Sequence, residues 1–469
     1  MSSISDAVKV VPSERQYAWQ KLEFYAFFHF GLNTFTGKEW GSGHDDQLIF
    51  NPAGFSADQW VSAVKSAGMK GAILTCKHHD GFCLWPSQYT GYTIKNTPFL
   101  NGNGDIVKSL SESCKAQGIK FGVYLSPWDR HEPSYGSGKE YNEYFMNQLR
   151  ELLTNYGDIF CVWFDGACGE GANGKKQSYD WDGYFSVIRE LQPEAAISIC
   201  GPDVRWCGNE AGHCRESEWS VVPEFLADEE KIADKSQKKD DTEFRERKVN
   251  SRVEDLGSRD IISKADKLIW YPCEVNTSIR PNWFYNENDN DKVRSLEELL
   301  NIYYQSVGGN ASFLLNVPPD KRGLVYEEDV KRLKELGLYL EAFYSNNLAP
   351  SAKITADTWA EGYGPSNILN EDEDQYWKSE KETAEILLEF PDEQTVGHVI
   401  LMENIRDSQR VESFSLYAEV NGTSVEIYKG SVIGHKKICI LDEVRTKKLT
   451  IKIHQSRIHS TLNFVGVYS

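Results

Sequence analysis

Residues 158–166 read DIFCVWFDG, an apolar run that ends in an aspartate and a glycine. Three earlier runs have the same apolar character: FYAFFHF (24–30), GAILTC (71–76) and FGVYLS (121–126). Helical patterns separate these runs, among them SADQWVSAVKSAG (56–68), where Ser56 and Gln59 form a potential capping box. Short apolar strands that alternate with amphipathic helices predict parallel βα units in a sheet buried on both faces.

Later segments supply further units of the same kind. They are the strands AAISIC (195–200), KLIWYPCEV (267–275) and ASFLLNV (311–317), and the helix SLEELLNIYYQSVGG (295–309). We therefore predict an α/β fold, a (β/α)8-like TIM barrel over residues 1–347, whose later strands can be irregular. A doubly wound sheet is the rival, but no strand leads into a G-x-G-x-x-G turn. The highly charged segment 226–252 is interpreted as a solvated insertion.

The pattern changes near residue 350, where short alternating strands and polar turns begin. The predicted strands are AEILLEF (384–390), HVILMENI (398–405), SFSLYAEV (413–420), TSVEIY (423–428), KKICILDEV (436–444), KKLTIKI (447–453) and LNFVGVYS (462–469). This pattern predicts an antiparallel β-sandwich over residues 348–469.

Composition excludes several classes of function. The 469 residues carry a formal charge of −19, which disfavours binding to nucleic acid or to an anionic membrane. No stretch approaches the roughly 20 apolar residues of a transmembrane helix. Residues 1–20 lack the basic-then-apolar order of a signal peptide, so a cytoplasmic protein and a chain whose signal was removed both remain open. The ten cysteines form no C-x-x-C pair, and those in apolar runs are interpreted as buried free thiols.

Active sites of such barrels lie at the carboxyl ends of the strands. Asp165 ends one strand against an aromatic wall, although an aspartate there could instead cap the next helix. His29, His78, His79 and Tyr124 end other strands. These polar side chains are the candidates for a site at the mouth of the barrel.

A metal site is the second interpretation of the histidines. Adjacent side chains on a strand point to opposite faces, so His78 and His79 can ligate one ion only if the strand breaks there. Asp129 and His131 are further potential ligands. Since no H-x-H motif and no set of three histidines with a carboxylate is evident, we predict no metal.

Taken together, these motifs resemble family 29 α-L-fucosidases, which are retaining glycoside hydrolases. The resemblance spans roughly residues 15–325. It rests on FHFGLNTFTGKEWGSG (28–43), TCKHHDGFCLWPS (75–87), GVYLSPWD (122–129), VWFDGA (162–167), GPDVRWCGNEAG (201–212), SIRPNWFY (278–285) and LLNVPPDKRG (314–323). The segment ILNEDEDQYWKS (368–379) resembles galactose-binding-like β-sandwiches, some of which hold glycan or calcium.

The resemblance implies roles for individual residues. Asp165 matches the nucleophile, and Glu210 in RWCGNEAG matches the acid/base of the subfamily that acts on α-1,3 and α-1,4 linkages. The positions that match sugar contacts are His29, Glu39, Trp40, His78, His79, Tyr124 and Trp283. Glu39 is also a rival acid/base, as are Glu216 and Glu218, for which a solvated or salt-bridged role is preferred.

The implied activity is hydrolysis of terminal α-1,3/1,4-linked fucose from Lewis-type oligosaccharides or glycoconjugates, through a covalent fucosyl-enzyme and without a cofactor. The family also suggests a periplasmic or secreted protein. Two alternatives remain from the residues themselves. A non-catalytic glycan-binding protein would keep the sugar contacts without needing both carboxylates, and a metal-dependent barrel hydrolase would lose activity with a chelator.

Overall fold

The fold was taken from a computed structural model, which describes residues 1–469 except 230, 233–235, 237–253 and 370–372. The charged segment 226–252 lies largely outside the described residues, so its predicted solvated role is not tested. Within the described residues, no helix has the length and apolar character needed to cross a bilayer.

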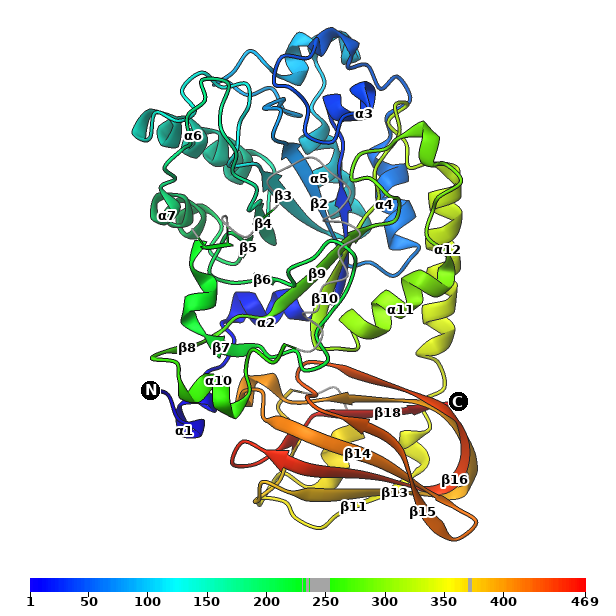
Figure 1. Ribbon diagram of the computed structural model, residues 1–469. Coiled ribbons are helices and arrows are strands. Elements are labelled where there is room, and N and C mark those ends of the chain that lie inside the picture. The colour runs from blue at the N-terminus through cyan, green and yellow to red at the C-terminus, as the bar shows by residue number, and fades with distance from the viewer. Residues whose placement is uncertain (230, 233–235, 237–253, 370–372) are drawn as a thin grey trace.

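The first two thirds of the chain form a nearly closed barrel of eight parallel strands, as predicted (Figure 1). In sheet order they are β5 (Ala196–Ile199), β4 (Cys161–Phe164), β3 (Lys120–Leu125), β2 (Gly71–Lys77), β1 (Phe24–Phe28), β10 (Ala311–Asn316), β9 (Cys273–Ser278) and β6 (Arg205–Trp206). A single bridge between Ser198 and Val204 links the two edges. The (β/α)8-like fold class is therefore confirmed.

Helices cover the outside of the barrel (Figure 1). They are α4 (Ala57–Lys65), α5 (Ile106–Gln117), α6 (Lys139–Asn155), α7 (Trp181–Leu191), α11 (Leu296–Ser306) and α12 (Glu327–Phe343). The predicted capping box at Ser56 is only half formed. Ser56 Oγ accepts the N–H of Gln59, but the Gln59 amide exchanges two hydrogen bonds with the backbone of Val325 instead of returning to Ser56.

Four shorter helices and one extra strand pair also belong to the described residues of this part of the chain. The helices α1 (Ile4–Ala7) and α2 (Glu14–Gln20) precede β1, and α3 (Leu32–Thr36) follows it. The predicted strand 267–275 is wrong as one element, because it is broken at Tyr271 and Pro272. Its first part, β8 (Leu268–Trp270), pairs antiparallel with β7 (Val221–Pro223) and is followed by the barrel strand β9. The helix α10 (Arg259–Ser263) precedes β8.

The C-terminal part, called the C-terminal domain below, is built on a separate antiparallel sheet, as predicted. Its six-stranded sheet contains β11 (Lys353–Ala356), β13 (Ala384–Met402), β14 (Val411–Val420), β15 (Thr423–Gly430), β16 (Lys437–Ser456) and β18 (Phe464–Tyr468). A two-stranded sheet, β12 (Trp377–Lys378) with β17 (Thr461–Leu462), contributes Trp377 and Leu462 to the same core. Four predicted strands merge in pairs into β13 and β16, because register shifts between Glu389 and Gln394 and between Val396 and His398 interrupt the pairing without ending either strand.

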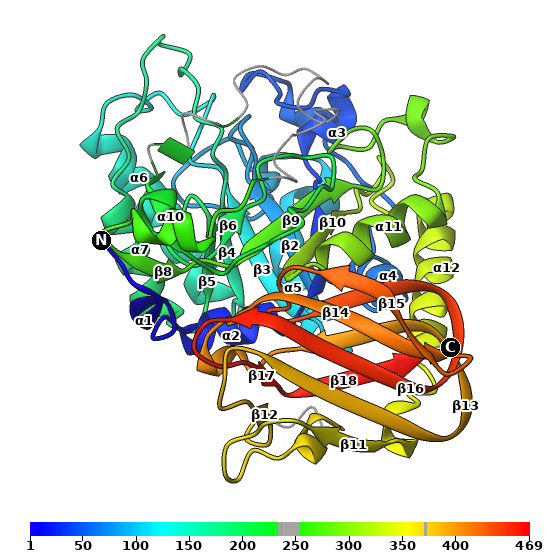
Figure 2. The same cartoon turned by 60° about the horizontal axis from the view of Figure 1, so that its bottom comes forward.

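This domain lies against the amino-terminal end of the barrel strands, opposite the end where catalytic sites form (Figures 1 and 2). Glu23, just before β1, accepts hydrogen bonds from His435 Nε2 at 2.9 Å and Lys436 Nζ at 2.7 Å. The N–H of Asn310, just before β10, bonds the carbonyl of Lys436. The C-terminal domain is thus a support for the barrel on the side away from its mouth.

All ten cysteines are free, and nine of them are buried. Cys76, Cys161, Cys200 and Cys439 are the four predicted as buried thiols in apolar strands, and each is confirmed. Burial raises the pKa of each of these thiols, so they are unreactive packing groups.

Candidate active site

A single pocket at the carboxyl ends of the barrel strands collects nearly all of the predicted site residues. Its lining includes eight of them: His29, Glu39, Trp40, His78, His79, Asp165, Glu210 and Trp283. The ninth, Tyr124, lies directly beside it and donates a hydrogen bond from its hydroxyl to Asp165 Oδ2 at 3.0 Å. The described residues that line the pocket all fall between Phe27 and Trp283, so the C-terminal domain supplies none of them.

Asp165 directly follows β4 and its carboxylate is held on both oxygens. Oδ1 accepts the N–H of Ala167 at 2.8 Å, and Oδ2 accepts the Tyr124 hydroxyl. Burial raises the pKa of Asp165 above its usual value, while these two donors act in the opposite direction. The predicted alternative of a helix cap does not apply, because the next helix, α7, is capped by Asp180. Asp165 is therefore a fixed carboxylate that faces the pocket.

The three histidines lie together in the pocket, and His78 and His79 are grouped with this carboxylate. The strand β2 ends at Lys77, so the side chains of His78 and His79 do not have to point to opposite faces of the sheet. Their ring centroids lie 4.1 Å apart. His78 stacks on Tyr124 with ring centroids 5.6 Å apart, and His29 lies 5.6 Å from His78. Burial lowers the pKa of His29 and His79 to about 3, and that of His78 well below its usual value. All three rings are therefore neutral at physiological pH.

The hydrogen-bond network assigns the tautomers of two rings. Asn316 Nδ2 donates to the Trp283 carbonyl at 2.8 Å, so its Oδ1 is the acceptor that faces His29 Nδ1 at 2.9 Å. His29 Nδ1 consequently carries the proton and Nε2 carries the lone pair. Ser126 Oγ donates to the Trp128 carbonyl at 2.7 Å, so it accepts from His79 Nδ1 at 2.7 Å. His79 Nε2 is then also a hydrogen-bond acceptor, 3.7 Å from Asp165 Oδ2.

Glu39, Trp283 and Glu210 form a chain of contacts on the other side of the pocket. The Glu39 carboxylate accepts the backbone N–H of Trp283 at 2.9 Å and of Phe284 at 3.3 Å. The Trp283 indole donates to Glu210 Oε2 at 3.1 Å. Glu39 thereby fixes the loop that carries Trp283, and Trp283 orients the carboxyl group of Glu210.

The rival carboxylates occupy structural positions. Glu218 is 0% exposed and pairs with Arg205 and Arg215. Burial opposes its ionisation, but the two guanidinium groups outweigh this and hold the pKa of Glu218 below its usual value. Glu216 is exposed and does not line the pocket. The salt-bridged interpretation of Glu218 and the solvated interpretation of Glu216 are both confirmed.

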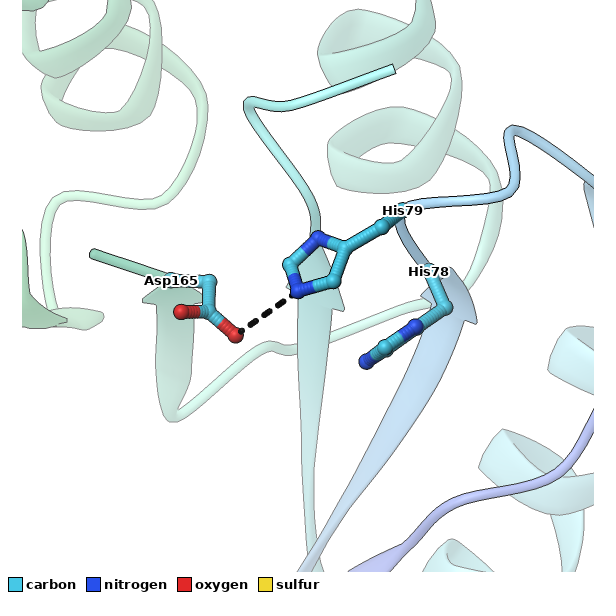
Figure 3. A group of neighbouring side chains, drawn as sticks. All are labelled: His78, His79 and Asp165. Atoms are coloured by element: carbon cyan, nitrogen blue, oxygen red, sulfur yellow. Dashed lines mark ion pairs between the residues drawn. The ribbon is translucent and has the colours of Figure 1, made fainter. Parts of the chain in front are cut away.

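The potential metal ligands divide into two groups. Asp129 binds Lys77 Nζ at 2.8 Å within the barrel, and His131 Nδ1 contacts the Gly43 carbonyl at 2.6 Å, so both have structural partners. His78, His79 and Asp165, in contrast, each offer one ligand atom within 4.8 Å of the others (Figure 3). The break in β2 that a shared ion requires is therefore present.

Comparison with known proteins shows to which protein family this pocket belongs. The family model described as alpha-L-fucosidase matches residues 11–344, which include the whole pocket. The chain belongs to the alpha-L-fucosidase family. It is a glycoside hydrolase, and the resemblance of its strand-end motifs to family 29 is confirmed.

Relatives of this enzyme extend over its full length. Alpha-L-fucosidase 1 of Arabidopsis thaliana is 40% identical and covers 98% of this chain and 87% of its own. A putative alpha-L-fucosidase from Bacteroides ovatus superposes with a TM-score of 0.86 at 43% identity, over 99% of this chain and 75% of the other. A GH29 fucosidase of Ruminococcus gnavus, solved in complex with fucose, superposes with a TM-score of 0.84 at 31% identity, over 98% and 95%.

Several residues that line the pocket were not predicted from the sequence: Phe27, Trp163, Ile199, Trp206 and Asn276. Trp206 Nε1 donates to Asn276 Oδ1 at 2.9 Å, so the two residues form one unit beside Glu210. Trp206 belongs to β6, which has only two residues and gives no periodic signal. Asn276 was missed because the predicted strand ended at residue 275, whereas β9 continues to Ser278.

A buried carboxyl group beneath the pocket was also missed. Glu274 on β9 is fully buried, and it accepts hydrogen bonds from Trp163 Nε1 at 2.9 Å and from the Tyr25 hydroxyl at 2.5 Å. Trp163 lines the pocket and stacks on Tyr124 with ring centroids 5.3 Å apart. Burial raises the pKa of Glu274 to about 7. Glu274 therefore joins β1, β4 and β9 across the barrel and fixes the aromatic floor of the site.

We predict that Glu274→Leu destabilises the enzyme by roughly 3 kcal/mol, because the buried indole N–H and the Tyr25 hydroxyl both lose their acceptor. Glu274→Gln is the matched control. Its amide oxygen can still accept from Trp163, and its amide group can donate to the Tyr25 oxygen. Urea unfolding should show that the glutamine variant keeps most of the wild-type free energy of unfolding. Equal losses in both variants would contradict this role of the hydrogen bonds.

Proposed function

We propose that the enzyme is a retaining α-L-fucosidase that releases terminal α-1,3- and α-1,4-linked fucose from branched, Lewis-type oligosaccharides or glycoconjugates. One observation carries this proposal: Asp165 and Glu210 open onto the same pocket, and neutral histidines and tryptophan rings surround them. Two carboxyl groups with different roles are what glycoside hydrolysis with retention requires. The fucose complex of the Ruminococcus gnavus relative supports a fucosyl group as the occupant.

In the first step, Asp165 attacks the anomeric carbon and Glu210 protonates the departing glycosidic oxygen, which gives a covalent fucosyl-enzyme. The Tyr124 and Ala167 donors fix the carboxylate for this attack. Because burial removes Asp165 from bulk water, its negative charge is poorly solvated in the free site, and this favours transfer of that charge to the new bond.

In the second step, Glu210 removes a proton from the incoming water, which attacks the anomeric carbon and releases Asp165. Trp283 holds Glu210 in place through its indole N–H during both steps. Two changes of configuration restore the original one, so the product is α-L-fucose.

The histidines and aromatic rings bind the sugar. His29 and His79 present unprotonated Nε2 atoms, which accept hydrogen bonds from fucose hydroxyl groups. Trp40, Trp283 and Trp163 provide apolar walls for the ring and its methyl group. The loop that carries Trp206 and Glu210 faces the leaving group and is the basis for the proposed linkage preference.

Substrate comparison tests the linkage preference. A Lewis-type trisaccharide with α-1,3- or α-1,4-linked fucose should be hydrolysed with a kcat/KM at least about 10-fold above that of an α-1,2-linked fucoside, a difference of roughly 1.4 kcal/mol in transition-state binding. A simple aryl α-L-fucoside should also be a poorer substrate than the trisaccharide. Preference for the α-1,2 linkage would contradict the proposed specificity while leaving the fucosidase assignment intact.

A further inference from the structure

Three side chains of the pocket, His78, His79 and Asp165, each offer a potential ligand atom to one metal ion. His78 and His79 follow β2, and Asp165 follows β4, two strands further along the barrel. Figure 3 shows the His79 ring and the Asp165 carboxylate directed toward each other, with the His78 ring beside them. One ligand atom from each residue lies within 4.8 Å of the other two.

The closest pair consists of two acceptors. Ser126 Oγ accepts a hydrogen bond from the protonated His79 Nδ1, so Nε2 presents a lone pair to Asp165 Oδ2 at 3.7 Å. Two lone pairs at this distance cannot bond each other and are brought together favourably by a cation or a proton donor between them. A cation about 2.1 Å from each atom would subtend an angle of roughly 125°. The distance of 3.7 Å between His79 Nε2 and Asp165 Oδ2 is close to the separation of neighbouring ligand atoms in a metal site.

His78 supplies an independent observation. Its side chain is 8% exposed, and its Nδ1 has no hydrogen-bond partner within the part of the chain that the structure describes. A buried ring nitrogen without a partner is costly unless something binds it.

We propose that His78, His79 and Asp165 form a binding site for one transition-metal cation of the Zn²⁺ or Co²⁺ class, and that the bound cation inhibits the enzyme. Two imidazoles and one carboxylate favour these ions over Ca²⁺ and Mg²⁺, which prefer oxygen ligands. A cation on Asp165 Oδ2 would occupy the carboxylate proposed as nucleophile. Its effect is therefore opposite to that of a catalytic metal: the metal-free form is the active one.

Direct binding tests this site without reference to turnover. We expect wild-type enzyme to bind one Co²⁺ per chain at the pocket, with visible d–d absorption bands of a low-coordinate site that excess L-fucose removes. His79→Gln and Asp165→Asn should each weaken the fucose-sensitive Co²⁺ binding at least about 10-fold. The matched control is His44→Gln, because His44 is an exposed histidine that does not line the pocket, and this variant should bind as the wild type does.

Two results would overturn the proposal: cobalt bands that fucose leaves unchanged, or bands that persist in both pocket variants. Circular dichroism shows whether the variants remain folded. Kinetics on the wild type give a second readout. Zn²⁺ should raise KM for an aryl fucoside with little change in kcat, and EDTA should restore full activity. Inhibition that lowers kcat alone would place the ion elsewhere.

The inhibition part of this inference rests on the proposed role of Asp165, whereas the binding part does not. Fucose-sensitive cobalt binding together with an unchanged kcat/KM in saturating Zn²⁺ would retain the metal site and reject Asp165 as nucleophile. Loss of activity in EDTA that Zn²⁺ restores would reject the inhibitory site and the metal-independent fucosidase mechanism together.

Discussion

Asp165→Ala is expected to lower kcat by roughly 10³-fold or more, because the variant lacks the carboxylate that forms the covalent intermediate. The loss should appear in kcat and not in substrate binding, since the histidines and tryptophans that bind the sugar remain. Stopped assays with an aryl α-L-fucoside, together with binding of L-fucose to the variant, measure the two effects separately.

Azide distinguishes loss of a nucleophile from general damage to the pocket. The space left by the Asp165 side chain can admit this small anion, which should partly restore turnover and give β-L-fucosyl azide, the product of a single inversion. Asp182→Ala is a control, because Asp182 is an exposed residue in the first turn of α7. It should turn over substrate as the wild type does. Near-normal activity of Asp165→Ala without azide would remove Asp165 from the mechanism.

Glu210→Ala is expected to slow hydrolysis most for substrates whose leaving group must be protonated before it can depart. Hydrolysis of a Lewis-type trisaccharide should fall by roughly 10²–10⁴-fold, because the sugar leaving group cannot depart without protonation. Fucosyl fluoride or a dinitrophenyl fucoside should retain much more of its rate in the first step. The alkaline limb of the pH profile should also flatten.

The other acidic residues of the region provide the comparison. Glu216→Ala should hydrolyse both kinds of substrate at the wild-type rate, since Glu216 is exposed outside the pocket. Glu39→Ala should lower the rate of hydrolysis of all substrates to a similar extent, because Glu39 fixes the backbone of Trp283 and Phe284. Normal hydrolysis of the trisaccharide by Glu210→Ala, with the leaving-group pattern found in Glu39→Ala instead, would transfer the acid/base role to Glu39.

The barrel and the residues at its mouth could be predicted because they follow from local patterns. Buried parallel strands are short and apolar, and a polar residue at the end of each strand marks the edge where a site forms. Asp165, His29 and Tyr124 were found in this way. The convergence of His78 and His79 depended on where β2 ends, which periodicity alone does not determine.

The features that were missed depend on contacts between distant parts of the chain. Glu274 lies inside the barrel because it binds Tyr25 and Trp163 from two other strands, and no local pattern signals this. The two-residue strand β6 is defined by its pairing with β9, which lies far along the chain. Gln59 was predicted to cap its own helix, but it bonds Val325, far along the chain.

The central claim is that Asp165 becomes covalently attached to fucose, and active-site labelling tests it most directly. A 2-deoxy-2-fluoro-L-fucosyl fluoride should form the intermediate quickly and release it slowly, because the fluorine at C2 destabilises both transition states while the leaving group stays reactive. Mass spectrometry of peptides after digestion should place one fluorofucosyl group per chain on Asp165. Attachment to Glu39, Glu210 or any other residue, or no attachment while α-fucosides yield β-L-fucose, would contradict the account.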